Sequence, residues 1–133
     1  MKITILGAGN MGCANAADLT LKGHEVTLVK TSHSMHNETF NYVCAHNNEI
    51  TLWQEGEEQT ARIHAVTTDL SSVATADLVY ITTQTNVHEQ LIQRIAPLLR
   101  KGQVVLISPG YFSTAYFLLF SYTHLTLPTK RIV

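Results

Sequence analysis

Short apolar runs alternate along the chain with segments whose apolar residues recur at helical spacing. The runs lie at residues 2–6, 25–30, 78–82 and 103–107. Runs of this length, rich in Val, Ile and Leu, are typical of buried strands in a parallel sheet. Residues 10–22 and 87–99 instead carry an apolar residue every three or four positions, which predicts amphipathic helices. This alternation predicts an α/β fold with a doubly wound parallel sheet.

The middle of the chain predicts smaller elements. Residues 34–47 predict a polar helix rich in His and Asn, and residues 69–76 predict a short helix. Residues 50–54 and 61–66 predict two strands joined by an acidic turn. Tyr42 and Trp53, which lie in these segments, are expected to pack in the core.

The helix after the apolar run at residues 78–82 has a sequence signal for its start. Asn86 and Glu89 have the spacing of a capping box, in which each side chain bonds the backbone of the other residue. His88 lies between them and would either cap the helix or face a bound ligand. Pro109-Gly110 is expected to end the strand at residues 103–107.

A glycine-rich turn joins the first strand to the first helix, with the pattern G-x-G-x-x-G. This context, at the start of a βαβ unit, is the one in which the pattern indicates a dinucleotide-binding Rossmann fold. The first glycine permits the tight turn, the second leaves room for a pyrophosphate, and the third lets the helix pack against the strands. The alternative is a purely structural turn. The predicted cofactor-binding residues here are Gly7, Ala8, Gly9, Asn10, Met11 and Gly12.

The residues at the strand ends indicate which dinucleotide would bind. NAD enzymes usually place Asp or Glu after the second strand, where the carboxylate bonds the ribose 2′-OH. This chain has Lys30, Thr31 and Ser32, which would attract a 2′-phosphate and favour NADP over NAD. Alternatively, Lys30 is only a solvated charge. Thr83 and Gln84 follow the run at residues 78–82 and are candidates to line the nicotinamide-side ribose, or they simply cap the strand.

Composition excludes several other classes of protein. The chain has 133 residues, 14% of them charged, and a formal net charge of −1, so a nucleic-acid partner is not expected. We expect no membrane span, no signal peptide and a cytoplasmic location, because no apolar run approaches about 20 residues. Cys13 and Cys44 are expected to be free thiols. The histidines at 33, 36 and 46 with Cys44 do not have the spacing of a zinc site, so no metal is expected.

Longer stretches resemble a known family. The segments KITILGAGNMGCANAADLTLKGHEVTLV, ADLVYITTQTNVHEQLIQRIAPLLRKGQVVLISPG and YFSTAYF together resemble the opine (octopine/nopaline) dehydrogenases. His88 and Ser108-Pro109-Gly110 are the more specific parts of the match. The resemblance implies an enzyme that condenses an amino acid with a 2-oxo acid and reduces the imine with NAD(P)H. Lys30 departs from this family's usual preference for NAD.

The resemblance also implies that catalysis needs a second, helical domain, which carries the catalytic His and Asp. We therefore assign no catalytic residue to this chain, expect the chain alone to be inactive, and expect substrate to bind only with that domain. The alternatives are the Rossmann domain of a ketopantoate reductase or of a glycerol-3-phosphate dehydrogenase-like enzyme, or a nucleotide-binding module without catalytic activity.

The end of the chain departs from the pattern. We expect residues 1–120 to form an NAD(P)-binding Rossmann domain that is truncated at its C-terminus. Residues 121–133 lack a helical stripe, and SYTHLTLPT within them matches the in-frame translation of a sequencing adapter. We therefore expect this segment to be a non-native tail. The alternative is a genuine edge strand.

Overall fold

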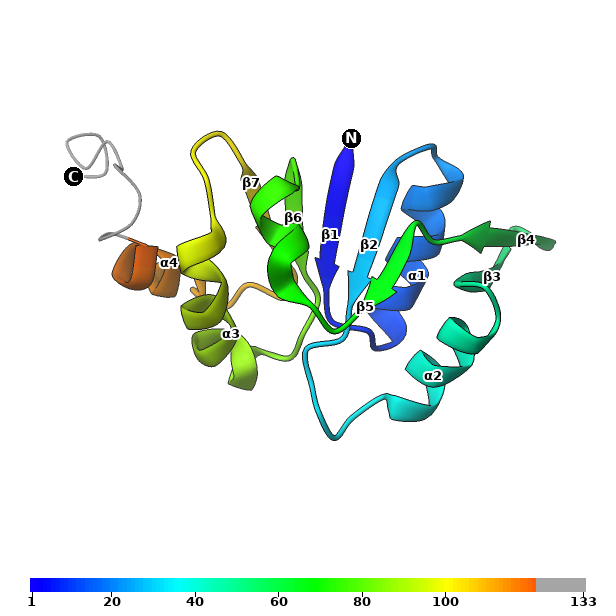
Figure 1. Ribbon diagram of the computed structural model, residues 1–133, viewed down its shortest axis with the longest axis horizontal. Helices are drawn as coiled ribbons and strands as arrows, with labels where there is room; N and C mark the ends of the chain where they lie inside the picture. The colour runs from blue at the N-terminus through cyan, green and yellow to red at the C-terminus, as the bar shows by residue number, and fades with distance from the viewer. Residues whose placement is uncertain (122–133) are drawn as a thin grey trace.

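A parallel sheet of five strands, in the order β5-β2-β1-β6-β7, lies at the centre of the computed structural model, which describes residues 1–121 (Figure 1). The first strand in sequence, β1, is also the central one, and it pairs with β2 on one side and β6 on the other. This order confirms the predicted α/β fold with a doubly wound sheet. The strands are β1 (Lys2–Leu6), β2 (Glu25–Val29), β5 (Ala65–Thr67), β6 (Leu78–Ile81) and β7 (Val104–Ile107).

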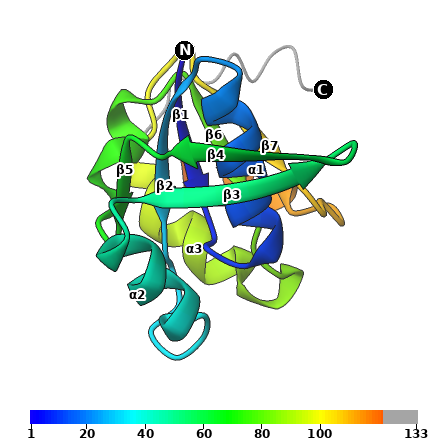
Figure 2. The same ribbon diagram turned by 90° about the vertical axis from the view of Figure 1, so that its right-hand side faces the viewer.

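Helices and one hairpin cover the sheet. An antiparallel hairpin of β3 (Glu49–Gln54) and β4 (Glu57–Arg62) forms a separate sheet and packs against the first helix (Figure 2). The α-helices are α1 (Asn10–Leu21), α2 (Asn37–Ala45), α3 (His88–Ile95) and α4 (Thr114–Ser121). The 3₁₀ segments are η1 (Leu70–Thr75), η2 (Thr85–Val87) and η3 (Ala96–Leu98).

The core consists of two apolar layers, one on each face of the sheet. Ile3 and Ile5 of β1 pack in the layer beneath α1 and the hairpin, whereas Leu6 belongs to the layer beneath α3. Val79 and Ile81 of β6 are fully buried in that second layer. Each such side chain contributes about 1.5–3 kcal/mol when it leaves water. Because both faces are covered, these strands are apolar throughout, as the sequence pattern indicated.

The polar helix expected at residues 34–47 is shorter than predicted. α2 begins only at Asn37, because His36 has left-handed backbone dihedrals (φ 60, ψ 21) that do not belong to a right-handed helix. Residues 31–36 therefore form a loop between β2 and α2. This loop matters because it runs beside the glycine-rich turn.

The strand expected at residues 61–66 is divided between two sheets. Ala61 and Arg62 end β4 in the hairpin, whereas residues 65–67 form β5 at the edge of the main sheet. Ala61 and Ile63 are both buried beneath α1, so the alternation continues while the strand changes partners. A period of two residues cannot show such a change, because both strands have the same period.

The start and the end of α3 also differ from the prediction. The capping box at Asn86 and Glu89 is wrong: η2 occupies residues 85–87, and α3 begins at His88 without a side-chain cap. The helix ends at Ile95, and the rest of the predicted apolar stripe lies in η3 and the residue after it. Pro97 explains this end, because it has no N–H to bond a carbonyl one turn earlier.

Two aromatic side chains lie outside the core that they were expected to join. Trp53 is 70% exposed near the tip of the hairpin. Tyr42 is 62% exposed and stacks on His46, with 3.8 Å between the ring centroids. Both belong to short peripheral elements that have no apolar layer above them.

Within residues 1–121, no helix is long and apolar enough to cross a bilayer. Residues 122–133 lie outside the described residues. The expectation of a non-native tail there stays a prediction.

Candidate functional site

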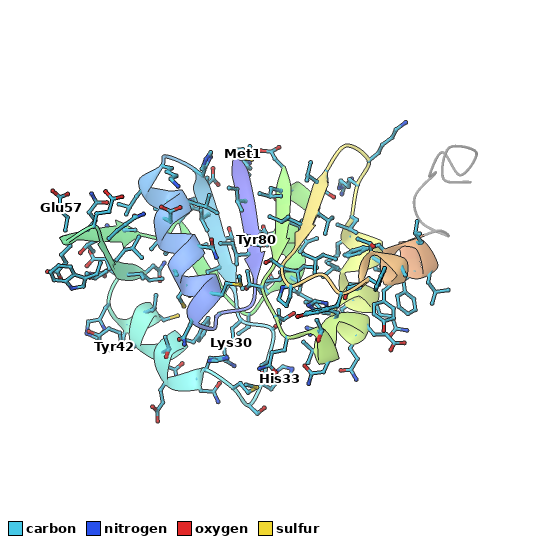
Figure 3. The ribbon with its side chains drawn as sticks, turned by 180° about the vertical axis from the view of Figure 1, so that it is seen from behind. Met1, Lys30, His33, Tyr42, Glu57 and Tyr80 are labelled. Atoms are coloured by element: carbon cyan, nitrogen blue, oxygen red, sulfur yellow. The ribbon has the colours of Figure 1, made fainter. Side chains whose placement is uncertain are left out.

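A pocket of about 410 Å³ lies where the carboxyl ends of β1, β2 and β6 meet. The glycine-rich turn, the loop from Lys30 to His36, the segment after β6 and one face of α3 form its walls. Figure 3 shows Lys30 and His33 on this side of the molecule, away from Met1 at the opposite ends of the strands. In an open α/β sheet, ligands bind at this edge, beside the strand where the connections change direction.

The pocket brings together most of the predicted site residues. Of the glycine-rich turn it includes Gly7, Ala8 and Gly9, and of the strand-end candidates it includes Lys30, Thr31, Ser32, Thr83 and Gln84. Asn10, Met11 and Gly12 do not line it. They form the first turn of α1, where Met11 is 43% exposed and Gly12 is buried.

The glycine-rich turn is held closed by a threonine that sequence reasoning did not single out. Gly7 has φ +121, a conformation that favours glycine, and an added Cβ would lie 2.7 Å from the hydroxyl oxygen of Thr82. That hydroxyl lies 3.2 Å from the carbonyl oxygen of Leu6 and 3.1 Å from that of Gly7, and it donates to them. A Cβ on Gly12 would lie only 1.7 Å from the Gly7 carbonyl oxygen, so α1 can approach the turn only with glycine there.

Gly9 keeps the pocket open. Its backbone is extended (φ −82, ψ −168), so other residues can adopt it without strain. A Cβ on Gly9 would project into the pocket and lie 3.2 Å from Nε2 of His36. α1 follows with no side-chain cap, which leaves the N–H groups of its first turn for a ligand. A helix N-terminus with such N–H groups favours an anion.

Lys30 is buried and already has a partner. It is 8% exposed, and its ammonium donates to the backbone oxygen of Ser32. The same Nζ lies 5.8 Å from the centroid of the Phe40 ring. The Ser32 hydroxyl accepts from the backbone N–H of Met35 at 3.1 Å. Lys30 therefore places its charge at the base of the pocket and at the same time shapes the β2–α2 loop.

His88 neither caps α3 nor faces the pocket, so both sequence-based alternatives for it are wrong. Its side chain is fully buried. Nε2 lies 3.0 Å from the backbone oxygen of Thr83, and Nδ1 lies 2.6 Å from Oγ of Ser113. A carbonyl only accepts, so the proton is assigned to Nε2, and Nδ1 accepts from the Ser113 hydroxyl. His88 thus joins the wall of the pocket to the β7–α4 connection.

Two buried groups lie close to the turn. The Thr83 hydroxyl is buried and has no hydrogen-bond partner among residues 1–121. Burial raises the pKa of the Cys13 thiol, whose Sγ lies 3.6 Å from the backbone oxygen of Ala8. Cys13 and Cys44 are free thiols. Within the described residues, no group of three His, Cys, Asp or Glu side chains is arranged to hold a metal ion.

The charges around the pocket share one sign. None of the residues that line it, all within the described part of the chain, is Asp or Glu. Lys30 contributes one cation and Arg94, from α3, contributes another. Sequence reasoning missed Arg94, although it lies seven positions after Val87 and therefore on the same face of α3. A wall of this kind suits an anionic ligand.

Together, the fold and the glycine-rich turn define a Rossmann-like domain, the fold class in which dinucleotides bind at such a turn. Residues 3–110 match the model of a family described as "Ketopantoate reductase PanE/ApbA". The chain therefore belongs to the PanE/ApbA ketopantoate reductase family. A member of this kind was one of the alternatives from the sequence, and the narrower resemblance to opine dehydrogenases is not confirmed as its family. No curated protein sequence matches the chain.

Several solved structures are similar in fold. An octopine dehydrogenase with NADH and L-arginine is 20% identical, with a TM-score of 0.66, and the match covers 80% of this chain and 28% of that one. A PanE/ApbA family ketopantoate reductase from Ralstonia eutropha is 26% identical, with a TM-score of 0.61 and coverage of 79% and 33%. Arogenate dehydrogenase from Synechocystis is 18% identical, with a TM-score of 0.60 and coverage of 87% and 37%. The matched region spans about a third of the length of these proteins.

Proposed function

We propose that this chain binds NADP(H) and is the cofactor-binding domain of a reductase. One observation carries the proposal: a glycine-rich turn opens onto a pocket that has two cationic side chains and no carboxylate among its lining residues. A carboxylate after the second strand would bond the 2′-OH of NAD and repel the 2′-phosphate of NADP. Lys30, Thr31 and Ser32 occupy that position here, so NADP(H) is the better fit and NAD(H) is the weaker ligand.

Different residues of the pocket would bind different parts of the cofactor. Gly9 and the first turn of α1 fit the pyrophosphate, because the absent Cβ leaves space and the N–H groups can donate. The hydroxyls of Thr31 and Ser32, which line the pocket after β2, would bond the 2′-phosphate. Thr83 and Gln84, which line the pocket after β6, would contact the nicotinamide-side ribose.

The proposed reaction is hydride transfer to a 2-oxo acid or to an imine formed from it. Bound NADPH supplies the hydride, which would add to the carbonyl or imine carbon while the oxygen or nitrogen gains a proton. The family match favours direct reduction of a ketopantoate-like carbonyl. We keep an opine-type reduction as the second candidate, on the resemblance of residues 1–120. The two differ in one requirement, because only the opine type needs an amino acid as second substrate.

Gly9→Val tests cofactor binding. The added side chain would fill the space between the turn and His36, while the extended backbone at this position tolerates it. We expect the chain to bind NADPH, seen as a change in nicotinamide fluorescence, and to show no turnover alone. We expect Gly9→Val to abolish binding without a change in the thermal unfolding midpoint.

Gly110→Ala is the matched control. An added Cβ there has only an ordinary contact, 3.7 Å from the Ile107 carbonyl oxygen, and Gly110 does not line the pocket. It should bind NADPH as the parent chain does. Equal NADPH affinity for the parent and Gly9→Val would overturn the proposal.

A further inference from the structure

Arg94 is a cation in the pocket whose side chain has no partner among residues 1–121. It lines the same pocket as Thr31 and Ser32 but comes from α3, on the opposite wall. Its side chain is exposed, and within residues 1–121 it takes part in no hydrogen bond or ion pair. An unpaired guanidinium beside a concave surface retains all of its hydrogen-bonding capacity for a ligand.

Lys30 differs from Arg94 in this respect. Its ammonium is buried, bonded to the Ser32 carbonyl and close to the Phe40 ring. One of the three N–H donors of its ammonium is used by that carbonyl, and the 8% exposure of Lys30 leaves little of the side chain open to a ligand. Its charge can still contribute to the electrostatic potential of the pocket. A direct bond to a phosphate therefore falls more readily to Arg94.

The face of α3 that carries Arg94 also fits the rest of an adenosine. Val87, which is 38% exposed, and Leu91 line the same pocket with apolar side chains, and Gln90 lines it with an amide. A purine packs against apolar side chains, and its 2′-phosphate would then lie between α3 and the β2–α2 loop. A guanidinium binds phosphate oxygens through two parallel N–H groups, which a lysine cannot do.

We propose that Arg94 selects NADP(H) over NAD(H) by bonding the 2′-phosphate from the α3 side of the pocket. This inference rests on the proposed function, because it needs a dinucleotide in the pocket. It assigns the specificity for NADP(H) to α3, which follows β6, and not to the end of β2 alone. Thr31 and Ser32 would complete the phosphate site from the opposite wall.

Arg94→Gln tests this assignment in the 133-residue chain. The glutamine keeps a polar but shorter side chain and removes the charge and the paired donors. We expect the Kd for NADPH to rise at least tenfold, equivalent to about 1.4 kcal/mol. The Kd for NADH should change by less than about twofold, because NADH lacks the 2′-phosphate. Adenosine 2′,5′-bisphosphate should compete with NADPH on the parent chain and compete much less on Arg94→Gln.

Arg100→Gln is the matched control, since Arg100 is an exposed arginine that follows η3 and does not line the pocket. It removes the same charge and should leave both Kd values within about twofold of the parent. Equal weakening of NADPH and NADH by Arg94→Gln would mean that the side chain contacts a part common to both. That result, or unchanged NADPH binding, would overturn the inference and leave the proposed function standing. A parent chain that binds neither cofactor would overturn both.

Discussion

His88 shows how one side chain can connect parts of the chain that are distant in sequence. Its imidazole bonds the Thr83 carbonyl at one end and the Ser113 hydroxyl at the other, and it is fully buried. Buried polar groups that lose a partner cost about 1–3 kcal/mol each, because no water replaces the lost bond. His88 thereby fixes the segment that carries Thr83 and Gln84 relative to the β7–α4 connection.

We expect His88→Ala to lower the free energy of unfolding by about 2 kcal/mol or more, since it leaves two buried groups unsatisfied and opens a cavity. Urea unfolding followed by circular dichroism measures this loss. His64→Ala is the control: the His64 side chain is 59% exposed, and among the described residues it pairs with the exposed Glu25 at 3.2 Å. Its effect should stay within about 0.5 kcal/mol. Similar losses in the two variants would contradict the structural role of His88.

At the scale of elements, Gln103 fixes the start of β7 against η1. Its Nε2 lies 2.6 Å from the Val73 carbonyl oxygen and 2.8 Å from that of Ala76. These carbonyls belong to the last part of η1 and the residue after it, and carbonyls at the end of a helical segment have no partner within the segment. At its other end η1 is capped by Asp69, which accepts from the backbone N–H of Ser71 at 2.9 Å. The connection between β5 and β6 is therefore bonded at both ends.

Gln103→Ala should lower the free energy of unfolding by about 1–3 kcal/mol, because two carbonyl oxygens lose their donor. Amide hydrogen exchange should also speed up more in β7 than in β1, because β6 separates β1 from β7 in the sheet. Gln93→Ala, on the exposed face of α3, is the control and should alter neither measurement. Unchanged stability of Gln103→Ala would show that water replaces the amide.

The elements that the sequence predicted well are those whose signal is local. β1, β2, β6, β7 and the glycine-rich turn each follow from a continuous run of residues and a change of periodicity. The division of residues 61–66 between two sheets depends on which strands they pair with, and a local sequence pattern carries no information about strand pairing. Likewise, Thr82 and Arg94 reach the pocket only because β6 and α3 pack beside the turn. About half of the residues that line the pocket could therefore be identified only from the tertiary structure.

At the scale of the whole molecule, one edge of the sheet carries exposed apolar surface. β7 pairs only with β6 within residues 1–121, and its Val104 and Leu106 are 60% and 46% exposed. Nearby in sequence, Phe112 is 93% exposed, and Leu119 of α4 is 66% exposed. Open strand edges and apolar patches promote association with other chains. The chain by itself should therefore tend to associate.

The double substitution Val104→Lys and Leu106→Lys should reduce this association, because charges on an edge strand oppose pairing with a second edge. Light scattering after size exclusion should show larger species for the parent than for the variant, with equal NADPH affinity. The control places two lysines on the hairpin instead, at the exposed Gln54 and Gln59. If this control reduced association equally, net charge and not the β7 edge would be responsible.

The central position of β1 has a consequence for the order in which the sheet can form during synthesis. Ile3 pairs with Val26 on one side but with Leu78 on the other. The ribosome thus completes the middle strand first, while the strand that covers its second side follows only after most of the domain has been translated. Until then one side of β1 has no strand to bond, and closing so long a loop carries an entropic cost. The nascent chain must therefore keep its central strand from other contacts for most of the time that translation takes.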